Sequence, residues 1–360
     1  MEYELNFKEF WEENTRLLNN SLDGTKSPLF FILEDHFIQH AVKIESTLSY
    51  YENPEYTINI HKKCNDILEK EIGIRYYAED NISYIKGAFE VVMGAERVIR
   101  EGNTPWLEST VEDIEDVKKL ILKAEKMDMR KAIPDEWREK KTKLKERCGK
   151  QLRFEPPWNG PATMACNLLG TTNTAMFIMD EPEVMKEFFT VMAERYVEFR
   201  EAVCIEDSGT VSRNGIGVND DSCYLFPPKI YEEICAPFLK KFFDSFAPMP
   251  HHKRRQHSDS SMGHLMGILN DLGVNEVNLG PEIPREDIRK ALPNAIIHGH
   301  MPPFLLQSGN AEEITQRVKT DIELLSGTGK HVESPAGVVP VGTPYENLRT
   351  YMLAVQTFGR

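Results

Sequence analysis

The feature that most constrains the fold is a regular alternation of short apolar segments with helical segments, which begins near residue 151 and continues to the C-terminus. Such an alternation is typical of βαβ units arranged around a parallel sheet. Each apolar segment is followed by a predicted helix, and roughly eight such units indicate an α/β fold of the (β/α)8 TIM-barrel type. We expect strands at 27–33, 74–80, 151–157, 210–221, 253–259, 274–280, 294–302 and 330–337.

Two helical segments are expected in addition to the barrel helices, at residues 1–26 and 110–150. Prolines predict breaks within the helical regions, after Asn53 and after Ile133, and Pro237 is expected to bend the helix at 227–246. A single barrel accommodates the full length of 360 residues. We therefore expect one domain over 1–360.

The charge balance limits the classes of partner. The chain has 43 basic and 57 acidic residues, a formal net charge of −14. A nucleic-acid binder or a protein that docks on anionic membranes needs a basic surface, so neither partner is expected. No apolar run reaches the ~18–20 residues of a membrane-spanning helix. The six cysteines are scattered without a CxxC pair, which favours a reduced, cytoplasmic protein.

In a barrel of this type, functional residues lie at the carboxyl ends of the strands. The expected strand ends are rich in histidine and carboxylate side chains, which indicates a metal site or an acid–base site at the barrel mouth. These strand-end residues are Glu79, Asp80, Trp158, Asn159, Asp220, Asp221, His257, Asp259, Glu282, His298, His300 and Glu333.

His257-Ser258-Asp259 is the most informative local pattern. Residues two apart on a strand point to the same side, so His257 and Asp259 are placed to share one ligand. Imidazole nitrogen and carboxylate oxygen are both ordinary zinc ligands. The alternative is a hydrogen bond between the two side chains that only fixes a loop.

Three other patterns carry a similar pair of interpretations. His298-Gly299-His300 has the same spacing, but one buried and one exposed histidine also explains it. Glu333 is either a ligand or a carboxylate that caps a loop. Asp220-Asp221 either binds a substrate hydroxyl or acts as an acid, or forms a turn that bonds to its own backbone.

The only dense basic cluster is HHKRRQH at 251–257. No aromatic residues interleave it, so we interpret it as a solvated strand start and not as a nucleic-acid patch. The chain lacks a GxGxxG motif after a strand, a GxxxxGK[ST] motif and a GxSxG motif. Dinucleotide, P-loop and α/β-hydrolase chemistry therefore lose their usual support.

Several longer stretches resemble the uroporphyrinogen decarboxylase superfamily, which includes the cobalamin-dependent methyltransferases. The resemblance implies a (β/α)8 barrel, in agreement with the strand pattern. The matching stretches, in family order, are WNGPATMACNLLG with DEPEVMKEFF, NDDSCYLFPPKIYEEICAPFLKKFF, HSDSSMGHLMGILNDLGVNEVNLG, IIHGHMPPFLLQSGNAEEITQRVK and SPAGVVPVGTPYENLRTYM.

The chain departs from both known branches at motif positions. True decarboxylases carry an N-terminal arginine-rich motif that grips porphyrinogen carboxylates, whereas SPLFFILEDHFIQH at 27–40 has no arginine. The zinc methyltransferases use a His-x-Cys pair at the fifth strand and a later cysteine. By resemblance, His257 matches the histidine, Asp259 replaces the first cysteine, and the third ligand is expected from Glu333, His300 or Asp221, in that order.

The resemblance implies a methyltransferase closer to the corrinoid-dependent branch. It would move a methyl group between a small methylated donor or acceptor, such as an aromatic methyl ether (O-demethylation), and cobalamin carried by a separate corrinoid protein. A homodimer is compatible with this reading. We expect zinc on His257, Asp259 and Glu333, with catalysis by Asp221, His257 and His300. Substrate contacts are expected from Trp158, Asn159, Asp220 and Phe226.

Two other functions remain open from the sequence. One is a cofactor-free decarboxylase of a porphyrinogen-like carboxylated substrate, in which Asp221 or Asp80 stabilises a protonated ring. The other is a non-enzymatic binding module that uses the barrel mouth.

Overall fold

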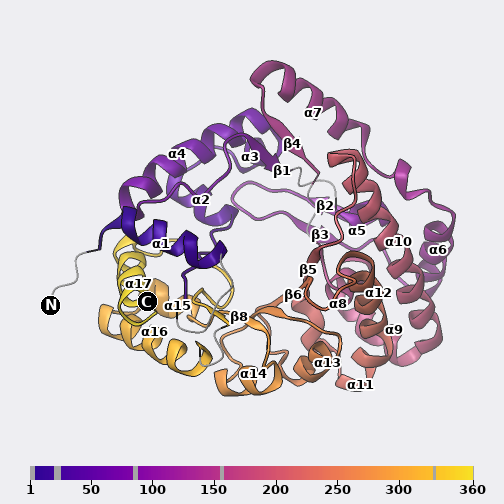
Figure 1. Ribbon diagram of the computed structural model, residues 1–360. Coiled ribbons are helices and arrows are strands. Elements are labelled where there is room, and N and C mark those ends of the chain that lie inside the picture. The colour runs from indigo at the N-terminus through magenta and orange to yellow at the C-terminus, as the bar shows by residue number, and fades with distance from the viewer. Residues whose placement is uncertain (1–4, 20–25, 84–87, 155–157, 327–329, 360) are drawn as a thin grey trace.

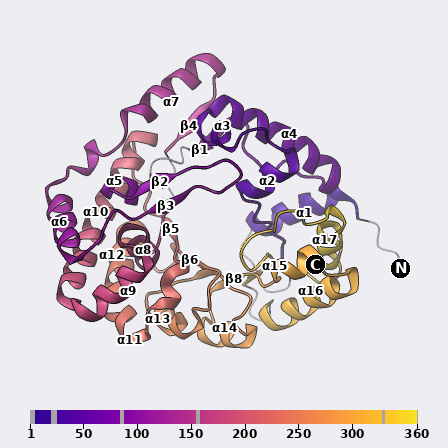
Figure 2. The same cartoon turned by 180° about the vertical axis from the view of Figure 1, so that it is seen from behind.

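The computed structural model describes residues 5–19, 26–83, 88–154, 158–326 and 330–359. Its centre is a parallel sheet in which the strands follow one another in chain order. Helices surround the strands on the outside, as the two opposite views show (Figures 1 and 2). The strands are β5 (Gly215–Asn219), β6 (Lys253–Ser258), β7 (Glu276–Leu279), β8 (Ile296–His298) and β9 (His331–Val332).

Parallel pairing continues beyond both edges of this sheet. Leu29 pairs with Glu333 beyond β9, and Asn159 pairs with Asn219 beside β5. β4 (Gln151–Arg153) in turn pairs in parallel with β1 (Asn81–Ser83). The chain therefore runs through its strand segments in barrel order, and the expected TIM-barrel-like α/β fold with N-terminal helices is confirmed.

The N-terminal and intervening helical regions break where prolines predict it. Asn53 accepts hydrogen bonds from the amides of Glu55 and Tyr56 and so caps the helix that starts at Pro54. The second break extends from Met127 to Pro134. The helices of these regions are α1 (Phe7–Asn19), α2 (Asp35–Val42), α3 (Thr47–Glu52), α4 (Pro54–Ile72), α6 (Ile114–Lys126), the short 3₁₀ turn η2 (Met129–Lys131) and α7 (Asp135–Cys148).

The remaining helices form the outer layer of the barrel. The capping box at Asn310 and Glu313 starts one of them, as each side chain bonds to the backbone of the other. They are α8 (Pro161–Leu169), α9 (Thr171–Asp180), α10 (Pro182–Ser208), α11 (Pro228–Ile230), α12 (Ala236–Phe246), α13 (Met266–Asp271), α14 (Arg285–Ala291), α15 (Pro303–Ser308), α16 (Ala311–Leu325) and α17 (Tyr345–Phe358), with 3₁₀ turns η3 (Asp221–Leu225) and η5 (Gly263–Leu265).

The second strand lies later in the chain than predicted, at β1 and not at 74–80. The side chain of Asn65 explains the difference. Its Oδ1 accepts from the amides of Tyr76 and Tyr77, and its Nδ2 donates to the carbonyl of Tyr77. Backbone groups that a strand would pair with a neighbour are therefore already used. Part of the predicted strand at 151–157 lies outside the described residues.

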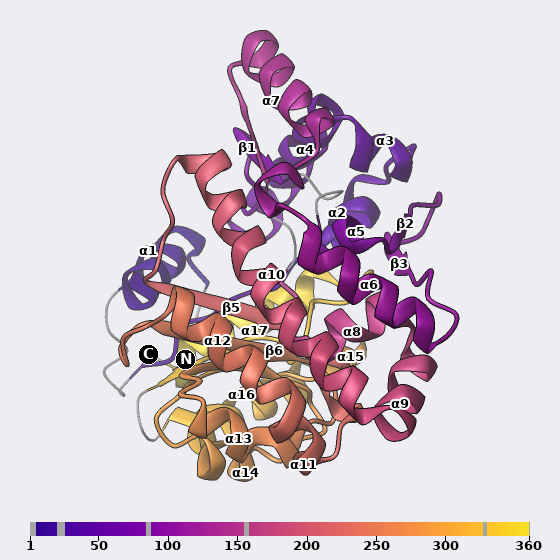
Figure 3. The ribbon, with the colours of Figure 1, turned by 90° about the vertical axis from the view of Figure 1, so that its right-hand side faces the viewer.

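A short helix and an antiparallel hairpin follow β1 and were not predicted. They are α5 (Phe89–Met93), β2 (Glu96–Val98) and β3 (Trp106–Glu108). The hairpin reaches across the ring towards α2 and α3 (Figure 1). Seen from the side, the hairpin and α1 lie at opposite sides of the molecule (Figure 3).

Two hydrophobic clusters fill the layer between strands and helices. The larger one includes Trp137, Phe188 and Phe242, and the other joins the N-terminal helices to α16 and α17. None of the helices that the structure describes combines the length and the apolar character needed to cross a membrane.

Candidate functional site

The register of the parallel sheet determines which side chains face the barrel interior. Asn219 pairs with His257, His257 with Asn278, and Asn278 with His298. Side chains at paired positions point to the same side of a sheet. These four polar residues therefore form one layer inside the barrel near the carboxyl ends of the strands, where the sequence places the candidate site.

The protonation of His257 is fixed by its neighbour Asn278. The Nδ2 group of Asn278 donates to the carbonyl oxygens of His298 and Pro335, at 2.8 and 3.0 Å. Its Oδ1 accepts from the amide of Gly337 and faces Nδ1 of His257 at 2.9 Å. Nδ1 of His257 therefore carries the hydrogen, and Nε2 presents its lone pair.

A pair of carboxyl groups faces this histidine. Oδ1 of Asp221 lies 4.0 Å from Nε2 of His257 and accepts a hydrogen bond from the amide of Asp259 at 3.2 Å. Burial and the negative charge of Asp259 raise the pKa of Asp221 to about 7. Burial, Asp35 and Asp259 also raise the pKa of Glu34. The mouth is therefore acidic, and Asp221 holds a proton close to neutral pH.

The imidazole beside this pair is neutral. Burial and the charge of Arg255 lower the pKa of His257, and Asp259 only partly opposes them. A protonated carboxyl next to a neutral imidazole is a usual arrangement for proton transfer to or from a bound molecule. The main chain of Asp259 approaches closely because residue 280 is glycine, where a Cβ would lie 2.3 Å from the Asp259 carbonyl oxygen.

Asp220 points away from this group, although it neighbours Asp221. Its side chain is fully buried, accepts from the amide of Thr163 at 2.8 Å and from the hydroxyl of Tyr231 at 3.2 Å. Burial raises the pKa of Asp220 to about 6. The carboxyl thus lies at the amino end of α8, where it stabilises the helix terminus.

Asn159 is also buried and is held by structural contacts. Its Nδ2 donates to Oε1 of Glu90 at 2.6 Å, and its carbonyl oxygen accepts from the hydroxyl of Tyr196. Glu90 is itself fully buried, and burial raises its pKa. The predicted substrate contact of Asn159 stays a prediction.

Trp158 and Phe226, the predicted apolar walls, lie between the strands and the outer helices. The guanidinium of Arg200 covers the indole ring of Trp158 at 4.7 Å, and the ring of Tyr196 packs on it edge-on. Phe226 is buried, and its carbonyl oxygen bonds to Nε2 of His264 at 3.0 Å.

Glu333 and His300 face the outer helices. Oε1 of Glu333 accepts from the hydroxyl of Tyr351 on α17 at 2.7 Å, and burial raises the pKa of Glu333. Nδ1 of His300 accepts from Arg317 at 3.0 Å, and its Nε2 donates to the carbonyl of Gly280. Both ring nitrogens of His300 are engaged, and burial lowers its pKa to about 4.

The structure therefore brings together Asp221, His257 and Asp259. It does not bring Glu333 to the other two predicted zinc ligands, because Glu333 lies on the helix side of the sheet. Among the described residues, no three His, Cys, Asp or Glu side chains are grouped so that they could hold a metal ion. The predicted zinc set does not converge, and we assign no chemical step to a metal.

Two residues near the site were not singled out from the sequence. Asn278 sets the tautomer of His257. The sequence indicates it through its place in the apolar strand VNEVNLG, where a buried amide side chain requires hydrogen-bond partners. Glu34 directly follows the first apolar stretch of the chain. Its position at the end of a predicted strand is therefore the sequence feature that indicates a site residue.

Comparisons with known proteins place the chain in a family. The sequence profile described as Uroporphyrinogen decarboxylase (URO-D) matches residues 83–358, more than half of the chain. No curated protein matches the sequence. Among solved structures, the chain is similar to a methyltransferase from Methanosarcina mazei, with 17% sequence identity and a TM-score of 0.63 over 96% of this chain and 98% of that chain. At this identity the likeness concerns the fold, and the profile match shows that this chain belongs to the uroporphyrinogen decarboxylase family.

Proposed function

We propose that the protein transfers a methyl group between a small methylated compound and a corrinoid carried by a separate protein. The observation that carries the proposal is the carboxyl of Asp221, which keeps a proton near neutral pH beside the neutral imidazole of His257. The similar solved structure that is named a methyltransferase supports the choice of reaction.

Demethylation of an ether requires help for the departing oxygen. When the C–O bond breaks, its electron pair stays on the oxygen, and the methyl group is taken by the electron pair of the corrinoid cobalt. A protonated carboxyl can deliver its proton to that oxygen as general acid, and Asp221 has both the protonation state and the position at the mouth. The bond of Nδ1 to Asn278 leaves Nε2 of His257 as an acceptor, which can orient the acid or the substrate.

The charge at the mouth disfavours the other reaction of the family. Burial, together with the negative charge of Asp259, raises the pKa of both Glu34 and Asp221 there. A porphyrinogen-like substrate with several carboxylates would meet like charges where it needs cationic partners. A small uncharged methyl ether carries no such penalty.

The predicted zinc ion remains a proposal that rests on His257 and Asp259 alone. Elemental analysis of the purified protein, in comparison with His257→Ala, decides it. The steps assigned to Asp221 do not depend on the outcome.

The test is methyl transfer from a series of aromatic methyl ethers to a purified corrinoid protein, followed by the absorbance of methylcobalamin. We expect Asp221→Asn to lower the rate by about 10²–10⁴-fold, the usual contribution of a general acid. Asp271→Asn, at the exposed end of α13, is the matched control and should keep the wild-type rate. No methylcobalamin from any ether would contradict the proposal, and release of CO₂ from uroporphyrinogen would favour decarboxylation.

A further inference from the structure

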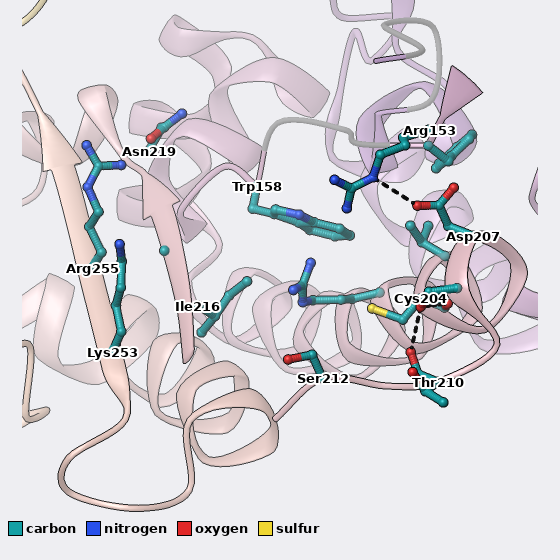
Figure 4. A pocket seen from close by; sticks show the side chains of 15 residues that line it. Arg153, Trp158, Cys204, Asp207, Thr210, Ser212, Ile216, Asn219, Lys253 and Arg255 are labelled. Carbon is teal, nitrogen blue, oxygen red and sulfur yellow. Dashed lines mark hydrogen bonds and ion pairs between the residues drawn. The ribbon is translucent and has the colours of Figure 1, made fainter. Parts of the chain in front are cut away.

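A cavity lies beside the strands at the end of α10. It has a volume of about 560 Å³ and is lined by residues of β4, α10, β5 and β6 together with the loop that follows α10 (Figure 4). Four lining residues are basic, and Asp207 is the only acidic one among the described lining residues. The basic residues are Arg153, Arg200, Lys253 and Arg255. A basic cavity is unexpected in a chain with a net charge of −14.

Arg255 is the central cation of this cavity. It pairs in register with Gly217 and with Glu276, so its side chain faces the barrel interior, and only 26% of that side chain is exposed. Its Nε lies 3.6 Å from Oε1 of Glu276, too far for a good hydrogen bond. Within the part of the chain that the structure describes, no acceptor is bonded to the two terminal nitrogens of Arg255. Two strong donors therefore point into the cavity region without a partner.

The carboxylate of Glu276 interacts with several basic side chains in this region. Oε1 of Glu276 lies 2.9 Å from Nζ of Lys253 and 3.3 Å from Nε2 of His298. Burial alone would raise the pKa of Glu276, but the bonds from His298 and Lys253 outweigh it and lower the pKa to about 2. Glu276 thus carries one negative charge against the permanent charges of Lys253 and Arg255.

Asp207, at the other wall of the cavity, also interacts with more than one basic side chain. Oδ2 of Asp207 accepts from Nε of Arg153 at 3.2 Å, and its Oδ1 lies 3.9 Å from Nζ of Lys141. The guanidinium of Arg200 stacks on Trp158. Among the described residues, Arg255 therefore faces only the distant and shared carboxylate of Glu276, and a partly buried cation without a close partner is costly.

The backbone keeps the space beside Arg255 open. Gly217 lines the cavity, and a Cβ at this position would lie 3.1 Å from Cβ of Arg255. Hydroxyl groups at the end of α10 and in the loop that follows it, from Ser208, Thr210 and Ser212, line the same hollow. The volume lies in the range of small-molecule sites, roughly 300–1,000 Å³.

We propose that this cavity binds a small organic anion that carries phosphate or carboxylate groups, with Arg255 as its main anchor. A guanidinium binds two oxygens of such a group side by side, which suits an arginine with two unpaired donors. The cavity begins at the amino ends of β5 and β6, where Lys253 starts its strand. It extends along the barrel to Asn219, in the layer of His257, but its basic residues and not the acidic carboxyls of the mouth line it, and the proposal does not depend on methyl transfer.

Isothermal titration of the full-length protein with pyrophosphate and with citrate, at ionic strength matched with sodium chloride, tests this proposal. We expect saturable binding of at least one probe, and the stronger of the two shows whether phosphate or carboxylate is preferred. Arg255→Gln should weaken it by about tenfold or more, the change that a lost charged hydrogen-bonding pair produces. Arg130→Gln, on an exposed turn that is distant in sequence from Arg255, is the matched control.

Glu276→Gln provides an independent test with the opposite sign. It removes the carboxylate that competes for Arg255 and Lys253, so the anion should bind severalfold more tightly than to wild type. Saturable binding lost in Arg255→Gln and strengthened in Glu276→Gln supports the proposal. Absence of saturable binding by both probes, or equal affinity in wild type and Arg255→Gln, overturns it.

Discussion

At the scale of residues, the proposed chemistry of the mouth rests on one carboxyl group whose pKa is raised to about 7. Asp221 owes its raised pKa to burial first and to the charge of Asp259 second. Interacting acids titrate as a pair, so a change in one partner moves the titration of the other. The pH dependence of turnover therefore reports on this contact.

We predict that the wild-type rate of methyl transfer falls as the pH rises through about 7, because Asp221, the proposed general acid, is then ionised. Asp259→Asn removes the neighbouring negative charge, so the pKa of Asp221 should fall and the loss of rate should begin at lower pH. The measurement is kcat/KM against pH for both proteins, with Asp271→Asn as control. A descending limb at the same pH in wild type and Asp259→Asn would contradict the assignment.

The sequence predicts Asp221, His257 and Asp259 as site residues, and the structure brings them together. It also predicts residues whose side chains face away from the site, because the direction of each side chain depends on where its strand ends. Asp220 and Asp221 are neighbours at a strand end, and no pattern says which of them turns inwards. β8 ends at His298, so His300 has left the strand and its side chain reaches the layer of Arg317. β9 has only two residues, which is too short for alternation to show that Glu333 faces the helices.

At the scale of elements, polar strands were the hardest to interpret. The segment HHKRRQH was expected to be a solvated strand start, and His251 and Lys253 are exposed, but from Arg254 onwards β6 is packed on both sides. Arg254 lies over Phe243 and bonds to the carbonyl of Ala247, whereas Arg255 faces the interior. The alternation along β6 predicts that Arg254 and Arg255 point to opposite sides of the strand. It does not predict which groups each arginine contacts, because those groups belong to other elements of the fold.

The predicted bend at Pro237 takes the form of a π-helical turn, η4 (Tyr231–Cys235), directly before α12. The amide of Ala236 bonds to the carbonyl of Tyr231, one residue further back than in an α-helix. Proline lacks an amide hydrogen, so a change of helical pitch at this point costs little. The turn holds Tyr231, whose hydroxyl bonds to Asp220.

The β2–β3 hairpin depends on contacts at its tip, which local sequence does not reveal. Glu101 accepts from the hydroxyl of Ser46 and from the amide of Thr47, both at 2.7 Å, and the amide of Gly102 donates to the hydroxyl of Thr47. These bonds lower the pKa of Glu101. They join the hairpin to the start of α3, more than 50 residues earlier in the chain.

We predict that Glu101→Ala detaches the hairpin tip, so the amides of Thr47 and Gly102 should exchange hydrogen severalfold faster than in wild type. Amides within α4 should be unaffected, since α4 has its own cap at Asn53. Hydrogen exchange resolved by mass spectrometry measures both. Glu108→Ala is the control, because the hydrogen bond that its side chain accepts comes from the indole of Trp106, within the hairpin itself. Unchanged exchange at Thr47 would show that the tip is held in another way.

At the scale of the whole molecule, the order of strands and helices follows from the sequence, but the closure of the ring does not. The first strand segment and the last helix meet, because the amide of Ser27 bonds to the carbonyl of Gly359 at 2.7 Å. On one side, Leu29 pairs with Glu333. Among the described residues, no strand pairing joins this segment to β1 on its other side.

Side chains replace strand pairing along that open edge. Oδ1 of Asn14, on α1, accepts from the amide of Leu29 at 2.7 Å, and its Nδ2 donates to the Leu29 carbonyl at 2.8 Å. Further along, the hydroxyl of Tyr76 donates to the carbonyl of Phe31. An exposed strand edge invites aggregation or unfolding, so these contacts protect the seam of the barrel. Apolar patterning carries no information about such single amide contacts.

We therefore predict that Asn14→Ala destabilises the whole fold. Asn14 and Leu29 are both buried, and the substitution leaves the amide and the carbonyl of Leu29 without these partners. An unsatisfied buried polar group costs about 1–3 kcal/mol, and the free energy of unfolding in urea should fall by at least that amount. Asn103→Ala, in the exposed hairpin loop, is the control and should unfold like wild type. Equal stability of Asn14→Ala and Asn103→Ala would mean that the seam is held by the pairing of Leu29 with Glu333 alone.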